Sequence, residues 1–247
     1  MPGHTDRLRV DIDGKSVDCA IVRSPRRRTI ALQIDHQGLS IRAPLRASER
    51  RLRAAVLSRS DWISLKLAEW EARPKPAVRE FKTGESLPFL GRHLTLHIVD
   101  HPSRARTKVE RQDTTLVVEI DRHLTGELRT RTIRKGLERW YRREAEDRFP
   151  GRVRHYAAFL GKPVASVQIR DQKRRWGSCD SRGIIRLNWR LIGADTDIID
   201  YVCAHEAAHL VEPNHSPAYW AVVSRLMPDW KIRRKRLNDT AGEFVPF

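Results

Sequence analysis

The chain has 247 residues, enough for one large domain or two smaller ones, and 40% of them are hydrophobic. Its 48 lysines and arginines outnumber 31 acidic residues, and the formal net charge of +17 will attract polyanions such as nucleic acid or nucleotides. It has no apolar run of about 18 residues, no apolar signal core near Met1 and only three scattered cysteines, which excludes a helical membrane protein and a disulfide scaffold. We therefore expect a cytoplasmic protein without a membrane partner.

Residues 1–122 are predicted to form a β-rich region with one helix. Asp13-Gly14 joins two segments of alternating polarity, which is typical of a β-hairpin. Ser48 is a predicted N-cap for a helix from Glu49 to Glu71. The predicted strands cover residues 8–12, 18–22, 29–34, 39–42, 79–82, 86–89, 93–99 and 115–120.

Residues 123–247 begin with a helical pattern over 128–160, with an interruption predicted at Pro150-Gly151. Basic residues surround its apolar stripe, so its charged face is either solvated or faces nucleic acid. Segments 164–170 and 183–189 predict a β-hairpin. The largely apolar segment 197–204 then predicts a buried helix.

The most informative motif is His205-Glu206-Ala207-Ala208-His209, followed by His215. Four residues span just over one helical turn, so His205 and His209 share a helix face. Such a pair can bind zinc while Glu206 acts as general base toward a metal-bound water. His215 is the predicted third ligand, which leaves one position for water or substrate. We expect one Zn²⁺ per chain.

A turn is needed to return the third histidine to the site. Pro213 cannot continue the helix, and Pro213-Asn214 predicts a sharp turn. Ser216 is then predicted to be the N-cap, and Pro217 the first residue, of a helix over 217–227. The third histidine would lie between two helices.

Other interpretations of this motif stay open. A bare HExxH pattern also occurs by chance, often on a surface helix with an ion pair. Glu212 or a downstream acid such as Asp229 competes with His215 for the third ligand position.

Several segments together resemble the YgjP-like family, a group of predicted zinc metallopeptidases related to the WLM and SprT-like proteins. Two differences from the family pattern are Ala207, where leucine is usual, and Tyr219, where phenylalanine precedes the tryptophan. The segments that carry the resemblance are Arg28-Thr29-Ile30, residues 38–44, Trp62-Ile63, Leu90-Gly91-Arg92, residues 173–179, residues 185–191, Asp200-Tyr201-Val202, HEAAH and Asn214-His215-Ser216.

The resemblance implies a zincin-type fold in residues 123–247, with an antiparallel edge strand above the metal helix that accepts an extended peptide. The expected fold class is therefore α+β: a β-rich N-terminal region with one helix, then a zincin-like catalytic domain with an antiparallel hairpin beside the HExxH helix. The histidine spacing equals that of metzincins, but Glu212 replaces their glycine, so we do not assign the chain to them.

Further side chains are candidates for the site. Cys179 is a candidate metal-proximal thiol, although a buried or turn cysteine is the alternative. The candidates for oxyanion stabilisation or substrate binding are Arg174, Arg175, Asn188 and Tyr219.

The leading functional hypothesis is a zinc-dependent peptidase with a polypeptide substrate. The first alternative is a nucleoside triphosphate pyrophosphatase in which arginines clamp the phosphates, but no phosphate-binding glycine loop is visible. The second is a nucleic-acid-binding protein with a structural metal, which an intact Glu206 beside three histidines disfavours. Binding or stimulation by nucleic acid is a separate expectation from the net charge.

Overall fold

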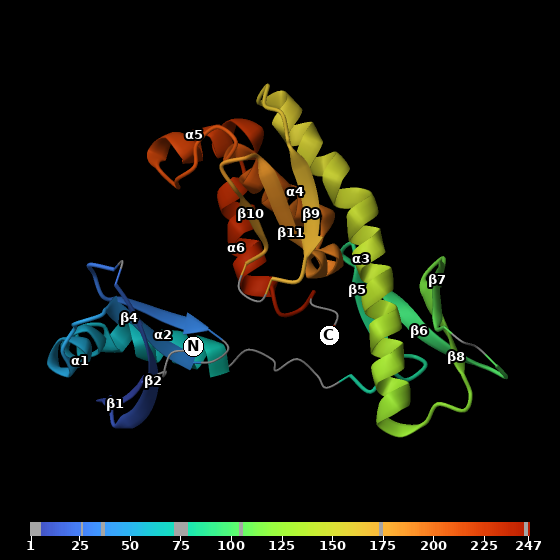
Figure 1. The fold of residues 1–247 in the computed structure, drawn as a ribbon, viewed down its shortest axis with the longest axis horizontal. Helices are drawn as coiled ribbons and strands as arrows, with labels where there is room; N and C mark the ends of the chain where they lie inside the picture. The colour runs from blue at the N-terminus through green and yellow to red at the C-terminus, as the bar shows by residue number, and fades with distance from the viewer. Residues whose placement is uncertain are drawn as a thin grey trace. The chain divides into compact units, whose positions relative to one another are not determined.

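The structure is a computed structural model that describes residues 6–25, 27–35, 38–71, 79–103, 106–172, 175–244 and 247. The chain divides into two compact units, Met1–Lys75 (unit 1) and Pro76–Phe247 (unit 2). The described residues form six α-helices and three β-sheets (Figure 1), so the α+β class is confirmed.

The division between the units differs from the boundary predicted after residue 122. That boundary lies inside unit 2, between strand β8 (Thr115–Asp121) and helix α3 (Gly126–Phe159), which share one hydrophobic core. The buried residues that join them include Leu116, Val118, Ile133 and Leu137. Periodicity indicates which face of an element is buried but not against which neighbour, so the sequence pattern could not place this boundary.

Unit 1 contains a four-stranded sheet in the order β1-β2-β4-β3. The predicted hairpin is confirmed, because β1 and β2 pair antiparallel around Asp13 and Gly14, which have φ of 50° and 75°. Strand β4 pairs parallel with β2 and antiparallel with β3. The strands are β1 (Asp6–Ile12), β2 (Lys15–Ser24), β3 (Ala31–Asp35) and β4 (Gly38–Pro44).

The single helix predicted in this region is wrong, because the structure has two: α1 (Glu49–Leu57) and α2 (Ser60–Glu71). The predicted N-cap is confirmed, since the Ser48 hydroxyl accepts a hydrogen bond from Arg51 N. The Ser58 hydroxyl donates to the carbonyl of Ala55 at the end of α1. Serine competes in this way with the helical hydrogen-bond ladder, which explains the break.

Unit 2 begins with a sheet in the order β5-β6-β8-β7. Residues 79–82, predicted as a strand, are not one, and β7 was missed because Lys108–Gln112 is mostly polar on both faces. The turn after β5 is held to the rest of the unit, since Leu90 N donates to Ile192 O at 2.8 Å. The strands are β5 (Ser86–Phe89), β6 (Arg92–His101), β7 (Lys108–Gln112) and β8 (Thr115–Asp121).

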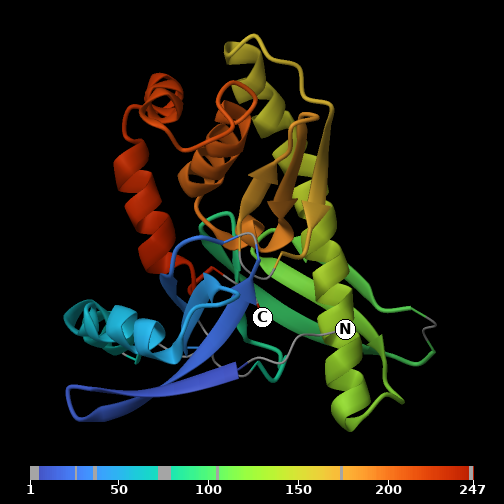
Figure 2. The same ribbon diagram turned by 60° about the vertical axis from the view of Figure 1, so that its left-hand side comes forward.

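Helix α3 runs without interruption through Pro150, so the predicted break is wrong. Phe149 and Val153 on either side of the proline are fully buried, and their packing outweighs the one missing backbone hydrogen bond. The helix contacts both sheets of unit 2, as Figure 2 shows. Whether its charged face meets nucleic acid stays a prediction.

The second sheet of unit 2 has the order β10-β11-β9 and corrects the predicted hairpin. Strands β9 (Ser166–Arg170) and β11 (Ile184–Asn188) pair parallel, not antiparallel. The short strand β10 (Gly177–Cys179) pairs antiparallel with β11 on its other side. The antiparallel hairpin is therefore β10–β11, and β10 is an edge strand that contacts the helix carrying the HExxH motif.

The remaining elements are helical: the 3-10 helix η1 (Trp189–Gly193), then α4 (Thr196–Ala208), α5 (Pro217–Leu226) and α6 (Trp230–Thr240). Helix α4 is buried along most of its length, as the apolar sequence predicted. Within the described part of the chain, no helix combines the length and apolar character needed to cross a membrane.

Candidate metal centre

Two helices and the turn between them place the three histidines. His205 lies in the last turn of α4, and His209 is its C-cap residue. The chain bends at Pro213-Asn214, and the Ser216 hydroxyl then accepts a hydrogen bond from Tyr219 N at 3.2 Å. The predicted turn, N-cap and second helix are thus confirmed, and His215 precedes the cap.

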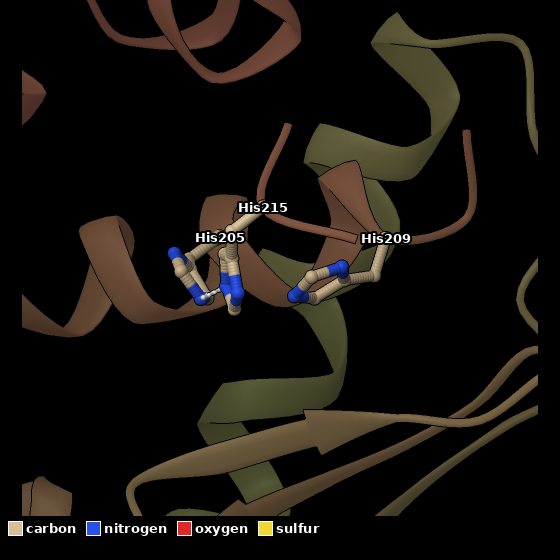
Figure 3. Close-up of side chains that lie close together, drawn as sticks. All are labelled: His205, His209 and His215. Atoms are coloured by element: carbon tan, nitrogen blue, oxygen red, sulfur yellow. Dashed lines mark hydrogen bonds between the residues drawn. The ribbon is translucent and has the colours of Figure 1, made fainter. Parts of the chain in front are cut away.

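The three imidazoles converge. One ring nitrogen from each of His205, His209 and His215 lies within 4.8 Å of the other two. Figure 3 shows the rings facing a common point, with His205 Nε2 and His215 Nε2 only 3.1 Å apart. Among the described residues this is the one close group of potential metal ligands, and it does not contain Glu212, Asp229 or Cys179.

Neighbouring groups hold the rings in place. His209 Nδ1 lies 3.0 Å from the carbonyl oxygen of Glu212, and donation of a proton there leaves Nε2 as the free lone pair. The Tyr219 ring stacks on His209 with centroids 4.5 Å apart. Its buried hydroxyl donates to the His205 carbonyl at 2.9 Å. Trp220 stacks on His215 with centroids 5.6 Å apart.

Burial favours the neutral form of His205 and His209, the form that metals require. Burial lowers the pKa of His205 to about 3, with smaller contributions from His209, His215 and Arg234. Burial also lowers the pKa of His209. The Nδ1 atom of His205 is buried without a hydrogen-bond partner among the described residues.

Glu206 is the buried carboxyl group of this site. It is 5% exposed, and its Oε2 has no hydrogen-bond partner within the described residues. Burial raises its pKa to about 8, against an opposing contribution from the positive charge of Arg175. A buried carboxyl group without a partner is costly, and such groups concentrate at functional sites. Gly177 of the edge strand β10 lies directly against this side chain.

The structure separates the other candidate residues. Arg175 is exposed beside Glu206, whereas Arg174 lies outside the described residues. Asn188 is buried, and its amide donates to the backbone carbonyls of Gln172 and Arg175 while its oxygen accepts from Arg190 N. These bonds hold Gln172 and Arg175 to Asn188, so the side chain of Asn188 has a structural role.

The polar atoms of two further candidates are hydrogen-bonded to backbone carbonyls. The Tyr219 hydroxyl donates to the backbone carbonyl of His205, and this bond gives it a structural role. Cys179 donates to the Asp180 carbonyl, and burial raises its pKa to about 11, so it is a thiol at neutral pH.

Two residues not predicted from the sequence are Arg234 and Trp230 of α6, which contact Trp220, the residue that stacks on His215. Trp230 stacks on Trp220 with centroids 4.2 Å apart, and the Arg234 guanidinium lies 5.1 Å from the Trp220 centroid. The only feature of the sequence that could have indicated Arg234 was the basic run that contains it, and the side chains of such a run usually face solvent.

Comparison with known proteins identifies a metallopeptidase family, which is consistent with a metal-binding histidine cluster. The family model "YgjP-like, metallopeptidase domain" matches residues 28–240. A search of curated proteins returns no match. Among solved structures, the chain is similar to the metallopeptidase zymogen abylysin of Pyrococcus abyssi, at 25% identity over 35% of this chain and 89% of that one, with a TM-score of 0.33. Because the family match covers most of its length, the chain belongs to the YgjP-like metallopeptidase family, a group of metal-dependent hydrolases.

Proposed function

We propose that this chain is a zinc-dependent peptidase in which Glu206 activates the attacking water. The observation that carries the proposal is Glu206, a buried carboxyl group with an unpartnered oxygen, which follows His205 in α4, the first of three converging imidazoles. A carboxyl group that is buried without a hydrogen-bond partner lowers the stability of the folded protein. A role as general base explains why the protein keeps such a group at position 206.

The three histidines fit zinc. Neutral imidazole is a preferred zinc ligand, and two nitrogens on one tetrahedral zinc lie about 3.3 Å apart. The His205 and His215 Nε2 atoms, 3.1 Å apart, already have nearly this spacing. The hydrogen bond of His209 Nδ1 to a backbone carbonyl is the kind of contact that orients a metal-binding ring. Zinc held here would supply Lewis acidity, which polarises a carbonyl and makes water acidic.

Glu206 would move the proton of the reaction. Glu206 would be ionised for this step, because the positive charge of bound zinc would lower its pKa from about 8. One carboxylate oxygen then takes a proton from the attacking water as a new C–O bond forms at the peptide carbonyl. The same carboxyl group then returns the proton to the leaving nitrogen as the C–N bond breaks. Gly177 and the surrounding buried residues exclude other water from this carboxyl group.

Strand β10 is the proposed platform for the substrate. It is the edge of its sheet and contacts α4, so its outer backbone groups can pair with an extended peptide. Arg175, two residues before the start of this short strand, would lie at one end of that peptide. This arrangement supports the zincin-type fold that the family resemblance implies.

The test compares zinc-loaded wild type with Glu206→Gln on a mixed panel of unfolded proteins and nucleoside triphosphates, read by mass spectrometry. We expect new peptides with wild type only, while both proteins bind zinc. Nucleoside monophosphates and pyrophosphate from wild type only would move the chain to phosphoanhydride chemistry. Equal peptide release by the Gln variant would remove Glu206 from the mechanism.

A further inference from the structure

Helix α6 presents four consecutive cationic side chains, and three of them are neutralised by acids. Arg233 pairs with Asp229 at 2.8 Å, and Lys235 pairs with Asp239 at 2.7 Å. The third pairing is that of Arg236 with Asp195 and Asp197. Arg234 makes no ion pair with any acid that the structure describes, although it stands between these residues in the sequence.

Arg234 instead lies on an aromatic wall of the metal centre. Its guanidinium carbon is 5.1 Å from the Trp220 centroid. Trp220 stacks in turn on His215, with centroids 5.6 Å apart and planes 24° apart. Trp230 stacks on Trp220 with centroids 4.2 Å apart and supports it. A continuous stack thus runs from the guanidinium to one of the three histidines.

The charge of Arg234 acts on the site. It contributes to lowering the pKa of His205, although burial is the larger cause. It also opposes the effect of burial on the pKa values of Tyr201 and Tyr219. Arg175 acts similarly on Glu206. Arg234 of α6 and Arg175, which precedes β10, therefore place positive charge near His205 and Glu206 respectively.

A guanidinium stacked on an aromatic ring keeps its N–H edge available. The planar fork of five donors matches a carboxylate, which it can bind through two parallel hydrogen bonds. Stacking on Trp220 also restricts the side chain before a ligand arrives, so less entropy is lost on binding. The other three cations of the run 233–236 already have their carboxylates. Lys231, the fifth cation of α6, lies over the outer ring Trp230 at 5.8 Å, whereas Arg234 lies over Trp220, the ring that stacks on His215, and is left to bind a carboxylate from outside the chain.

We infer that Arg234 and Trp220 form a subsite for a carboxylate of the substrate, so that the preferred substrates are peptides with an acidic residue near the scissile bond. This inference rests on the proposed peptidase function and adds the substrate class. Arg234 is a specificity residue in this scheme, because its partner is a substrate side chain and not the reacting carbonyl.

The experiment uses zinc-loaded full-length protein and a peptide series in which glutamate replaces glutamine at one position at a time around the cleaved bond. Wild type is expected to prefer glutamate at one position by about tenfold in kcat/KM, the value of one charged hydrogen-bonded contact. Arg234→Gln should slow cleavage of that glutamate peptide alone, and Arg234→Lys should retain part of the preference. The matched control is Arg225→Gln, an exposed arginine of α5 that loses the same charge and should keep the full preference.

A binding measurement separates the subsite from the proposed reaction. The same peptides are titrated into zinc-loaded Glu206→Gln with and without Arg234→Gln. Glutamate-dependent binding that needs Arg234 supports the subsite even if wild type cleaves nothing, and in that case only the peptidase proposal fails. The subsite is overturned if cleavage or binding shows no glutamate preference, or if the preference survives Arg234→Gln. Tighter, Arg234-dependent binding of a phosphoserine peptide would overturn the assignment to carboxylate.

Discussion

Gly177 lies so close to Glu206 that no other residue fits at this position without displacing the carboxyl group. A β-carbon on Gly177 would lie 2.5 Å from Glu206 Oε1, 2.6 Å from its Cγ and 2.8 Å from its Cδ. Gly177 is in the edge strand β10, and Glu206 is in α4, so the glycine sets how closely the strand approaches the HExxH helix. Position 177 therefore requires glycine because any side chain would collide with Glu206, the proposed general base.

Gly177→Ala should therefore reduce turnover far more than stability. The added methyl group must push the Glu206 carboxyl group aside, and a displacement of about 1 Å costs on the order of 100-fold in rate. We expect kcat to fall to that degree while zinc binding is retained, measured by peptide cleavage and metal content. Gly151→Ala is the control, because its β-carbon meets nothing within 4 Å and alanine favours the helix. Full activity of Gly177→Ala would show that Glu206 can act as general base from a displaced position.

Removing one imidazole should weaken zinc binding. His215→Ala leaves two ring nitrogens to bind the metal. Mutation of a residue that only orients a ligand typically weakens metal affinity by roughly 10- to 100-fold, and we expect the zinc dissociation constant of His215→Ala to rise by more than that. Competition with a chromogenic chelator measures it. His155→Ala, an exposed histidine of α3, should leave affinity unchanged, and Glu206→Gln should retain zinc. If His215→Ala binds zinc like wild type, then Glu212 or another acid would have to supply the third ligand.

The metal-free protein should respond to pH through Glu206. Its folded pKa, about 8, exceeds the ordinary value of 4.5, so the unfolded chain loses the proton first as pH rises. The contribution of this carboxyl group to stability is thus complete below about pH 4.5 and is lost as pH rises toward 8. Glu206→Gln resembles the protonated acid and should not show this loss.

The measurement is the difference in unfolding free energy between metal-free Glu206→Gln and wild type from pH 4.5 to pH 9. This difference cancels the contribution of His205, whose folded pKa is about 3 but whose ordinary value of 6.5 in the unfolded chain falls within this range. It should grow in favour of the Gln variant by on the order of 1–3 kcal/mol. A difference that stays constant with pH would mean that the carboxyl group is hydrated in solution and not buried.

Tyr219→Phe distinguishes a structural from a catalytic hydroxyl. The variant loses the buried hydrogen bond to the His205 carbonyl, which should cost about 1 kcal/mol of stability. The ring still stacks on His209 and keeps it in place. We therefore expect kcat to change by less than about threefold, which corresponds to less than about 1 kcal/mol in activation free energy. Thermal unfolding and peptide cleavage are measured on the same preparation. A loss of 100-fold or more in kcat would restore Tyr219 as an oxyanion donor.

Most local features of the site could be predicted from the sequence. The HExxH spacing placed His205 and His209 on one helix face, and Pro213 and Ser216 marked the turn and the next helix, because caps and breaks depend on a few adjacent residues. The hairpin at Asp13-Gly14 followed from turn chemistry in the same way. Pro150 is the exception, since packing of its neighbours overrode a local signal.

Contacts between distant parts of the chain were decided only by the tertiary structure. The sequence alone determined which residues can bind a metal, where the helices around them begin and end, and that the chain is strongly basic. It did not determine that β9 pairs parallel with β11, that Gly177 lies against Glu206, or that Arg234 of the basic run lies on Trp220 beside the histidines. Periodicity and spacing describe one element at a time, whereas strand order and side-chain contacts arise when several elements compete to cover the same core.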